Sequence, residues 1–244
     1  MVDPGMLSLV ATAFCIAGLV KGMVGLGLPT VSLGLLSLFV DLPTAMALLV
    51  IPSLVTNIWQ AIVGGEFISL LRRLWLFLLL AVTLVHVGAE LFTMIEMALL
   101  QRSLGALLLL YALLALIGKT PQLSPVQERV FSPICGAING MLTGLTGTLF
   151  VPGVMFLQAI GLQRDALVQA MGMLFAASTA SLGLALYWHG LMPFDVGILS
   201  CAALLPALFG MGVGQALRGH LSQELFRRLF LIAIGGLGSH ILLS

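Results

Sequence analysis

The chain has 244 residues, of which 60% are hydrophobic and 8% are charged, and its formal net charge is +1. Soluble domains carry about 25% charged residues, so this composition excludes an ordinary soluble protein and indicates a polytopic membrane protein. The near-zero charge argues against a nucleic-acid partner, which would need a basic surface. The chain opens Met-Val-Asp without a cationic stretch, so a cleaved signal peptide is not expected.

Eight apolar segments follow one another along the chain. Six have the length of one transmembrane helix, which needs about 20 apolar residues. These six are Thr44–Ile62, Leu74–Phe92, Ser103–Gly118, Leu167–Trp188, Val196–Leu217 and Leu229–Leu242. The other two, Met6–Val40 and Pro133–Leu162, are too long for one helix. The sequence therefore predicts an all-α polytopic membrane protein with a single transport domain over residues 1–244.

Each long segment is interrupted by a glycine-rich stretch that ends in proline. The first reads G-L-V-K-G-M-V-G-L-G-L-P from Gly18, and the second reads N-G-M-L-T-G-L-T-G-T-L-F-V-P from Asn139. Glycine frees the backbone and proline removes a donor, so each segment is predicted to be a broken helical hairpin. Whether the arms are re-entrant or fully spanning is left open, although Thr30–Val40 is short enough to favour a half-membrane element. Paired breaks in two halves indicate the binding site of a transporter.

The distribution of positive charge decides how these segments thread the membrane. If each crossed once, four cations would lie on one side and five on the other. If each doubles back, eight share one side, Arg102 is alone on the other and Lys21 lies inside the membrane. The eight are Arg72, Arg73, Lys119, Arg129, Arg164, Arg218, Arg227 and Arg228. Because cytoplasmic loops are rich in Lys and Arg, hairpins are favoured, with both termini in the periplasm.

The two halves are then related as inverted repeats. Each is a broken hairpin followed by three helices, with repeat 1 at about residues 6–118 and repeat 2 at about residues 133–243. One constant offset aligns Thr44–Leu48 with Gln169–Met173. Since the hairpins enter from opposite faces, their tips are expected to meet near the membrane midplane.

Lys21 is the first candidate for substrate binding, because an ionisable side chain within a membrane segment is a functional hypothesis by default. An ammonium beside glycine-exposed backbone N–H groups suits an anion. Asn139 occupies the matching position of the second break, and its amide can donate without adding charge. The alternative for Lys21 is a lysine that snorkels to the interface or pairs with a carboxylate.

The remaining candidates for substrate binding are glycines and polar side chains in the breaks or in the helices that follow. They are Gly22, Gly25, Gly27, Asn57, Gly140, Thr143, Thr146, Thr148 and Gln169. A threonine hydroxyl can instead bond its own helix. Serine and threonine also pack transmembrane helices together, so Asn57 and Gln169 stand out among the later helices.

His86 and Glu90 are four residues apart, so they share one face of a helix. Histidine titrates near neutral pH, which makes the pair a candidate for proton coupling. A structural or interfacial role is the alternative, because Glu90 lies near the outer end of its helix.

The sequence does not predict an enzyme. It contains no zinc-binding H-E-x-x-H pattern and no nucleotide-binding loop, so no cofactor and no metal site are expected. A passive anion channel, with Lys21 as its selectivity charge, is an alternative to a carrier.

The two breaks, Gly18–Thr30 and Asn139–Pro152, resemble those of the sulfite exporter TauE/SafE family, also called the toluene-sulfonate uptake permease family. The run L-V-Q-A-M-G-M-L-F from Leu167 is also similar. The resemblance implies secondary transport of sulfite, a sulfonate or a similar anion across the bacterial inner membrane. Many members carry three glycines in each break, whereas here Thr146 and Thr148 flank a single glycine.

The predicted function is therefore transport of a small sulfur-containing anion by alternating access, with substrate held between the two hairpin tips. A carrier of another small organic anion, such as a carboxylate, is a further alternative. The expected partners are the anionic substrate and the lipid bilayer. The oligomeric state, monomer or homodimer, is left open.

Overall fold

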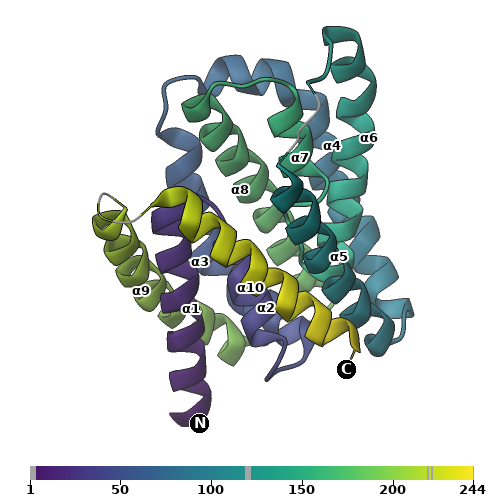
Figure 1. Cartoon of the computed structure of the whole chain (residues 1–244). Coiled ribbons are helices and arrows are strands. Elements are labelled where there is room, and N and C mark those ends of the chain that lie inside the picture. The colour runs from purple at the N-terminus through teal and green to yellow at the C-terminus, as the bar shows by residue number, and fades with distance from the viewer. Residues whose placement is uncertain (1–3, 119–121, 219, 221, 244) are drawn as a thin grey trace. The chain divides into compact units, whose positions relative to one another are not determined.

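The computed structural model describes residues 4–118, 122–218, 220 and 222–243, and all regular elements in this part of the chain are helices (Figure 1). Lys119, which was counted among the cytoplasmic cations, lies outside the described residues. The helices of the described part are α1 (Pro4–Val24), α2 (Leu28–Leu36), α3 (Leu42–Ile62), α4 (Phe67–Met94), α5 (Met97–Ile117), α6 (Pro125–Thr146), α7 (Gly153–Ala159), α8 (Arg164–Trp188), α9 (Phe194–Leu217) and α10 (Gln223–Leu243).

Seven helices of the described part are long and apolar enough to cross a membrane: α1, α3, α4, α5, α8, α9 and α10. The protein is therefore a multi-pass membrane protein of the all-α class. The six ordinary spans predicted from the sequence are confirmed as helices, but the helices begin earlier than the predicted spans. For example, α4 begins at Phe67 rather than Leu74 and includes Arg72 and Arg73. Hydropathy marks the apolar stretch, whereas helical hydrogen bonding continues into the polar interface.

Both long segments are interrupted at the predicted places. The first forms α1 and the nine-residue α2, and the second forms α6 and the seven-residue α7. At a rise of 1.5 Å per residue, α2 and α7 extend about 14 Å and about 10 Å. Neither can cross a hydrocarbon core of about 30 Å, so the second arm of each hairpin is short.

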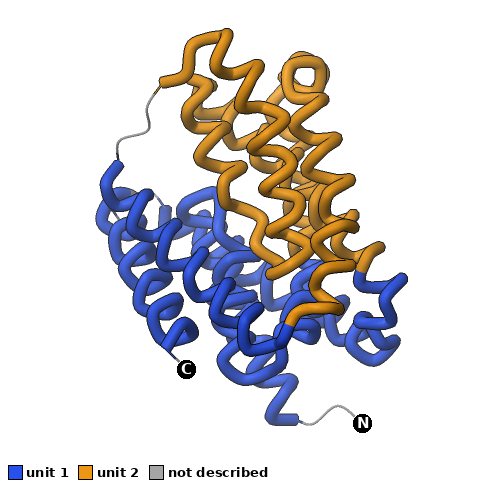
Figure 2. The backbone as a smooth tube through the Cα atoms, turned by 90° about the vertical axis from the view of Figure 1, so that its right-hand side faces the viewer, with its two compact units in different colours: residues 1–52, 96–118, 186–244 blue, residues 53–95, 119–185 orange. Residues whose placement is uncertain are grey.

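The chain folds into two compact units, and each takes helices from both halves of the sequence (Figure 2). Unit 1 comprises residues 1–52, 96–118 and 186–244, and so contains α1, α2, α5, α9, α10 and the start of α3. Unit 2 comprises residues 53–95 and 119–185, and so contains the rest of α3, α4, α6, α7 and most of α8. The long helix α3 passes from one unit to the other at Pro52.

In unit 1, α1 packs closely against α9 through small residues. A Cβ atom at Gly22 would overlap the carbonyl oxygen of Met211, and one at Gly214 would overlap that of Leu19. Gly18 and Gly210 meet the opposite helix in the same way. Glycine lets the two backbones approach, which is a common way to hold transmembrane helices together without a hydrophobic driving force.

Unit 2 uses the same arrangement between α4 and α6. A Cβ atom at Gly144 would overlap the carbonyl oxygen of Val85, and one at Gly88 would overlap that of Met141. Gly140 lies against Ala81. Gly140 and Gly144, on the last turns of α6, therefore allow the close packing of α6 against α4.

A hydrogen bond from α9 compensates for a proline inside α3. Pro52 has no N–H to donate to the carbonyl of Leu48, four residues earlier. The hydroxyl of Ser200 donates to this carbonyl oxygen at 2.8 Å and accepts from the backbone N–H of Ile51 at 3.2 Å. The helix therefore continues through Pro52 with its buried backbone satisfied.

Candidate substrate site

The first break contains two glycines with left-handed backbone. α1 ends at Val24, and Gly25 and Gly27 have φ angles of 86° and 110°. The N–H of Gly25 donates to the carbonyl of Lys21 at 2.7 Å. A Cβ atom at Gly25 would meet nothing within 4 Å, whereas Gly27 lies against Val20 and Phe230. The break therefore leaves open space beside Gly25.

Lys21 lies in the last turn of α1, one turn before Gly25, and only 5% of its surface is exposed. Its neighbour Gly22 is in close contact with α9 at Met211 and Gly214. The structure therefore places the ammonium within the packed part of unit 1 rather than on its surface. Inside a low-dielectric environment a fixed positive charge interacts with an anion far more strongly than it does in water.

The second break is closed by threonine side chains. Thr143 Oγ1 lies 2.8 Å from the carbonyl oxygens of both Asn139 and Thr148, which share its one hydrogen. Thr146 Oγ1 lies 2.8 Å from the carbonyl of Leu142 and 2.8 Å from Thr148 Oγ1. The hydroxyl hydrogens of all three predicted threonines are thus engaged within the break, and α6 ends there at Gly147, which has a φ of 73°.

Asn139 connects α6 to the start of α7. Its Oδ1 accepts a hydrogen bond from the N–H of Gly153 at 3.0 Å. Because a reversed amide would bring two donors together, this bond fixes which end is the NH2 group. The side chain is fully buried, and its Nδ2 has no hydrogen-bond partner among the described residues. Buried donors are nearly always satisfied in folded proteins, so this amide is poised to donate to something further.

Gln169 joins α8 to the end of α3. Its Nε2 donates to the carbonyl of Ala61 at 2.8 Å and its Oε1 accepts from the N–H of Glu66 at 3.0 Å. Gly172, one turn later, lies against Gln60 and Ala61. Both ends of the Gln169 amide are therefore used to hold the turn after α3 onto α8.

These contacts show that α3 and α8 run antiparallel in unit 2, because Gly64 lies beside Gln169 and Ala61 beside Gly172. The hydroxyls of three fully buried residues on these helices have no partner among the described residues; they are Ser53, Ser178 and Thr179.

The unpartnered groups of unit 2 lie on α3, α6 and α8. Asn139 is linked through Gly153 to α8, because Gly153 also lies against Leu174, one turn before Ser178. Asn57, on the part of α3 in unit 2, is fully buried as well. One amide NH2 and three hydroxyls without intramolecular partners form a set of buried hydrogen-bond donors suited to an oxyanion or to ordered water.

His86 lies on α4 and contacts α8. The hydroxyl of Ser181 donates to the carbonyl of Val82 at 2.8 Å, so the His86 Nε2 atom, 3.2 Å from that hydroxyl, is the donor of the second bond. Glu90 is exposed. The histidine therefore holds α4 to α8, and its coupling role stays a prediction.

A model of the sulfite exporter TauE/SafE family matches residues 10–241, which is nearly the whole chain. The chain belongs to the TauE/SafE family. The resemblance found in the two breaks is thereby confirmed, and the chain is a membrane transporter of the sulfite exporter type. No curated protein and no solved structure matches it.

For this TauE/SafE member, the sequence singled out one buried cation and several amides, and the structure distributes them over two units. Lys21 belongs to unit 1, whereas Asn57, Asn139 and Gln169 belong to unit 2. Their convergence on one site stays a prediction. Sequence reasoning did not select the unpartnered hydroxyls of unit 2 as site residues, because Ser and Thr are common in membrane helices. The signal that could have selected them is the adjacent pair Ser178-Thr179 within the apolar run of residues 170–180.

Proposed function

We propose that this protein is a secondary transporter that carries a small sulfur-containing anion, such as sulfite or a sulfonate, across the bacterial inner membrane by alternating access. Family membership supports transport of this class. The observation that carries the proposal for this chain is the Asn139 amide, which is fully buried, fixed in orientation and unpartnered at Nδ2.

The donor set fits the chemistry of an oxyanion. A sulfite or sulfonate group that leaves water must replace its hydration with hydrogen-bond donors, because an unpaired buried charge is very costly. Unit 2 contains an amide and hydroxyls that add no charge, and unit 1 contains the buried ammonium of Lys21. Neutral donors would hold a monoanion without binding it too tightly to release it.

Two features of the packing support a mechanism that uses two inverted repeats. α1 packs on α9 and α6 packs on α4. In the two predicted repeats α1 corresponds to α6 and α4 corresponds to α9, so the two pairs are equivalent, and each pair joins one repeat to the other. Both pairs cross through glycines. Motion of one group of helices against the other would alternate access to the donors.

The test is sulfite flux in liposomes that contain the purified protein. We expect saturable uptake, which sulfonates compete for and carboxylates do not. Lys21→Met should lower the flux at least tenfold, whereas Arg129→Gln, which removes an exposed cation elsewhere, should not. Single-channel currents would show a passive pore instead, and efficient competition by carboxylates would reassign the substrate.

The same liposomes test proton coupling through His86. His86→Gln retains a side-chain donor for Ser181 but removes the titratable ring. If His86 couples transport to protons, the variant loses accumulation driven by a pH gradient and keeps exchange of substrate across the membrane. Unchanged accumulation would restrict His86 to its structural contact.

A further inference from the structure

Unit 1 contains two adjoining cavities beside α10. The larger has a volume of about 500 Å³ and is lined almost entirely by apolar side chains of α1, α2 and α10. Its lining includes Ile16, Val31, Leu35, Phe230 and Leu237. Since several of these side chains are partly exposed, this cavity, which we call the apolar groove, opens to the surface of the unit.

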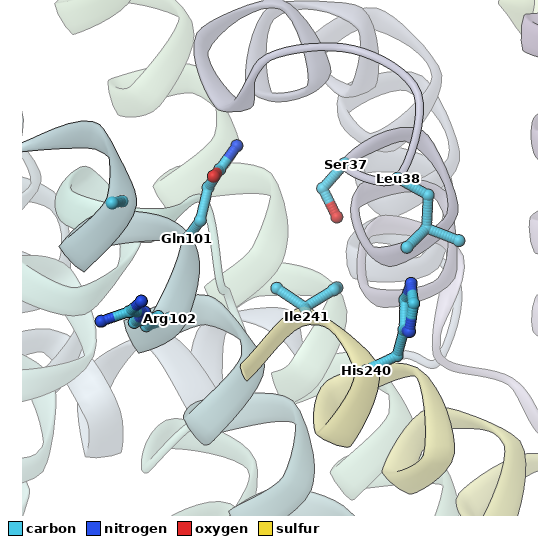
Figure 3. A pocket seen from close by; sticks show the side chains of 7 residues that line it. Ser37, Leu38, Gln101, Arg102, His240 and Ile241 are labelled. Atoms are coloured by element: carbon cyan, nitrogen blue, oxygen red, sulfur yellow. The ribbon is translucent and has the colours of Figure 1, made fainter. Parts of the chain in front are cut away.

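The smaller cavity has a volume of about 190 Å³ and a mixed polar and apolar lining. Figure 3 shows Gln101 from α5, His240 and Ile241 from α10 and Ser37 from the end of α2 around it, while the exposed Arg102 of α5 lies at its edge and points away from this group. We call it the polar pocket. His240 and Leu38 line both cavities, so the polar pocket adjoins the apolar groove.

The polar pocket offers unused donors. In the described part of the chain, Arg102 has no carboxylate partner and the Gln101 amide makes no hydrogen bond. Ser37 already donates to the carbonyl of Gly34 at 2.9 Å, so its oxygen only accepts. The pocket lining contains no acidic side chain. Its charge is therefore complementary to an anionic group.

The position of the two cavities fits the depth of a lipid molecule. Arg102 lies in the second turn of α5 and His240 in the last turn of α10, where helix ends meet the headgroup region. The apolar groove follows α10 from His240 to Phe226, which is about 21 Å of helix. A groove of this length with an almost entirely apolar lining suits a lipid acyl chain.

We propose that this surface of unit 1 binds one anionic phospholipid, with its phosphate at Arg102 and Gln101 and one acyl chain in the apolar groove. A basic pocket between membrane helices is a known kind of headgroup site. The lipid would cover the face of α10 that packs only lightly on α1 and α2. This site is separate from the breaks and does not depend on the proposed substrate.

The test uses delipidated full-length protein and native mass spectrometry with phosphatidylglycerol, phosphatidylcholine or glycerol phosphate. We expect one phosphatidylglycerol per chain, at least tenfold weaker binding of phosphatidylcholine, and no retention of glycerol phosphate. Arg102→Gln should weaken phosphatidylglycerol binding at least tenfold, and Arg129→Gln should not. Ala233→Trp, which fills the apolar groove, should weaken it as well.

A second measurement needs no variant. A phosphatidylglycerol with a photoreactive group on its acyl chain should label the wild-type protein on α2 and α10, within the groove. Equal binding of the two phospholipids, equal effects of the two arginine substitutions, or labelling confined to unit 2 would overturn the proposal.

Discussion

The side chain of Asn139 accepts a hydrogen bond from the backbone N–H of Gly153 at 3.0 Å and keeps a buried NH2 group without a partner in the described residues. One end of the amide thus fixes the second break, and the other end is available to a ligand. Because the oxygen and the NH2 group have different surroundings, substitutions that change one and retain the other can test their roles separately.

Asn139→Asp retains the oxygen that accepts from Gly153 and replaces the NH2 group with a second oxygen. We expect a folded protein whose sulfite flux is at least tenfold lower, because an acceptor or a negative charge now faces the anion. Asn139→Leu also leaves the N–H of Gly153 unsatisfied, which costs about 1–3 kcal/mol. Liposome flux and thermal unfolding measure the two effects. Normal flux in Asn139→Asp would remove Asn139 from the site.

The close crossing of α1 and α9 predicts different effects for two glycines on α9. Gly214→Ala should destabilise the protein by about 1–3 kcal/mol, because its Cβ would overlap the backbone of Leu19 and force the helices apart. Gly212→Ala, two residues away, should be neutral or slightly stabilising, because nothing lies within 4 Å of its Cβ. Thermal unfolding in one detergent compares them. Equal losses would mean that the crossing is looser than described.

Gln169 is expected to stabilise the fold more than it binds substrate. Gln169→Leu removes bonds to Ala61 and Glu66 and leaves both backbone groups without partners. We expect a loss of stability of about 2–6 kcal/mol, because each of the two unsatisfied groups costs about 1–3 kcal/mol. The KM for sulfite should be nearly unchanged in the protein that remains folded. A KM that rises tenfold without a change in thermal stability would restore Gln169 to the substrate site.

The hairpin threading predicts opposite sides for two arginines. In a variant without Cys15, Cys135 and Cys201, Arg102→Cys should react with an impermeant maleimide added to intact cells. Arg164→Cys should react only after the membrane is opened. Labelling of both from the same side would refute the threading and the periplasmic position of the termini.

Much of the helical layout was predictable, since hydropathy and backbone chemistry act locally. Runs of apolar residues located the six ordinary spans, and the glycines and prolines near Gly25 and Gly147 located both breaks. The partners of these helices were not predictable. Glycines such as Gly22 were expected to expose backbone to substrate, whereas the structure uses Gly22 for contact with α9.

The sequence by itself determined that this protein lies in a membrane, that two of its helices are broken, and that Lys21 and Asn139 occupy matching positions in the two breaks. Only the tertiary structure decided which polar groups keep an unused hydrogen-bond donor. Thr143 and Gln169 were candidates in sequence together with Asn139, but their donors are engaged by backbone carbonyls. The reason is physical: helix formation depends on nearby residues, whereas the satisfaction of a buried donor depends on whichever carbonyl the fold brings beside it.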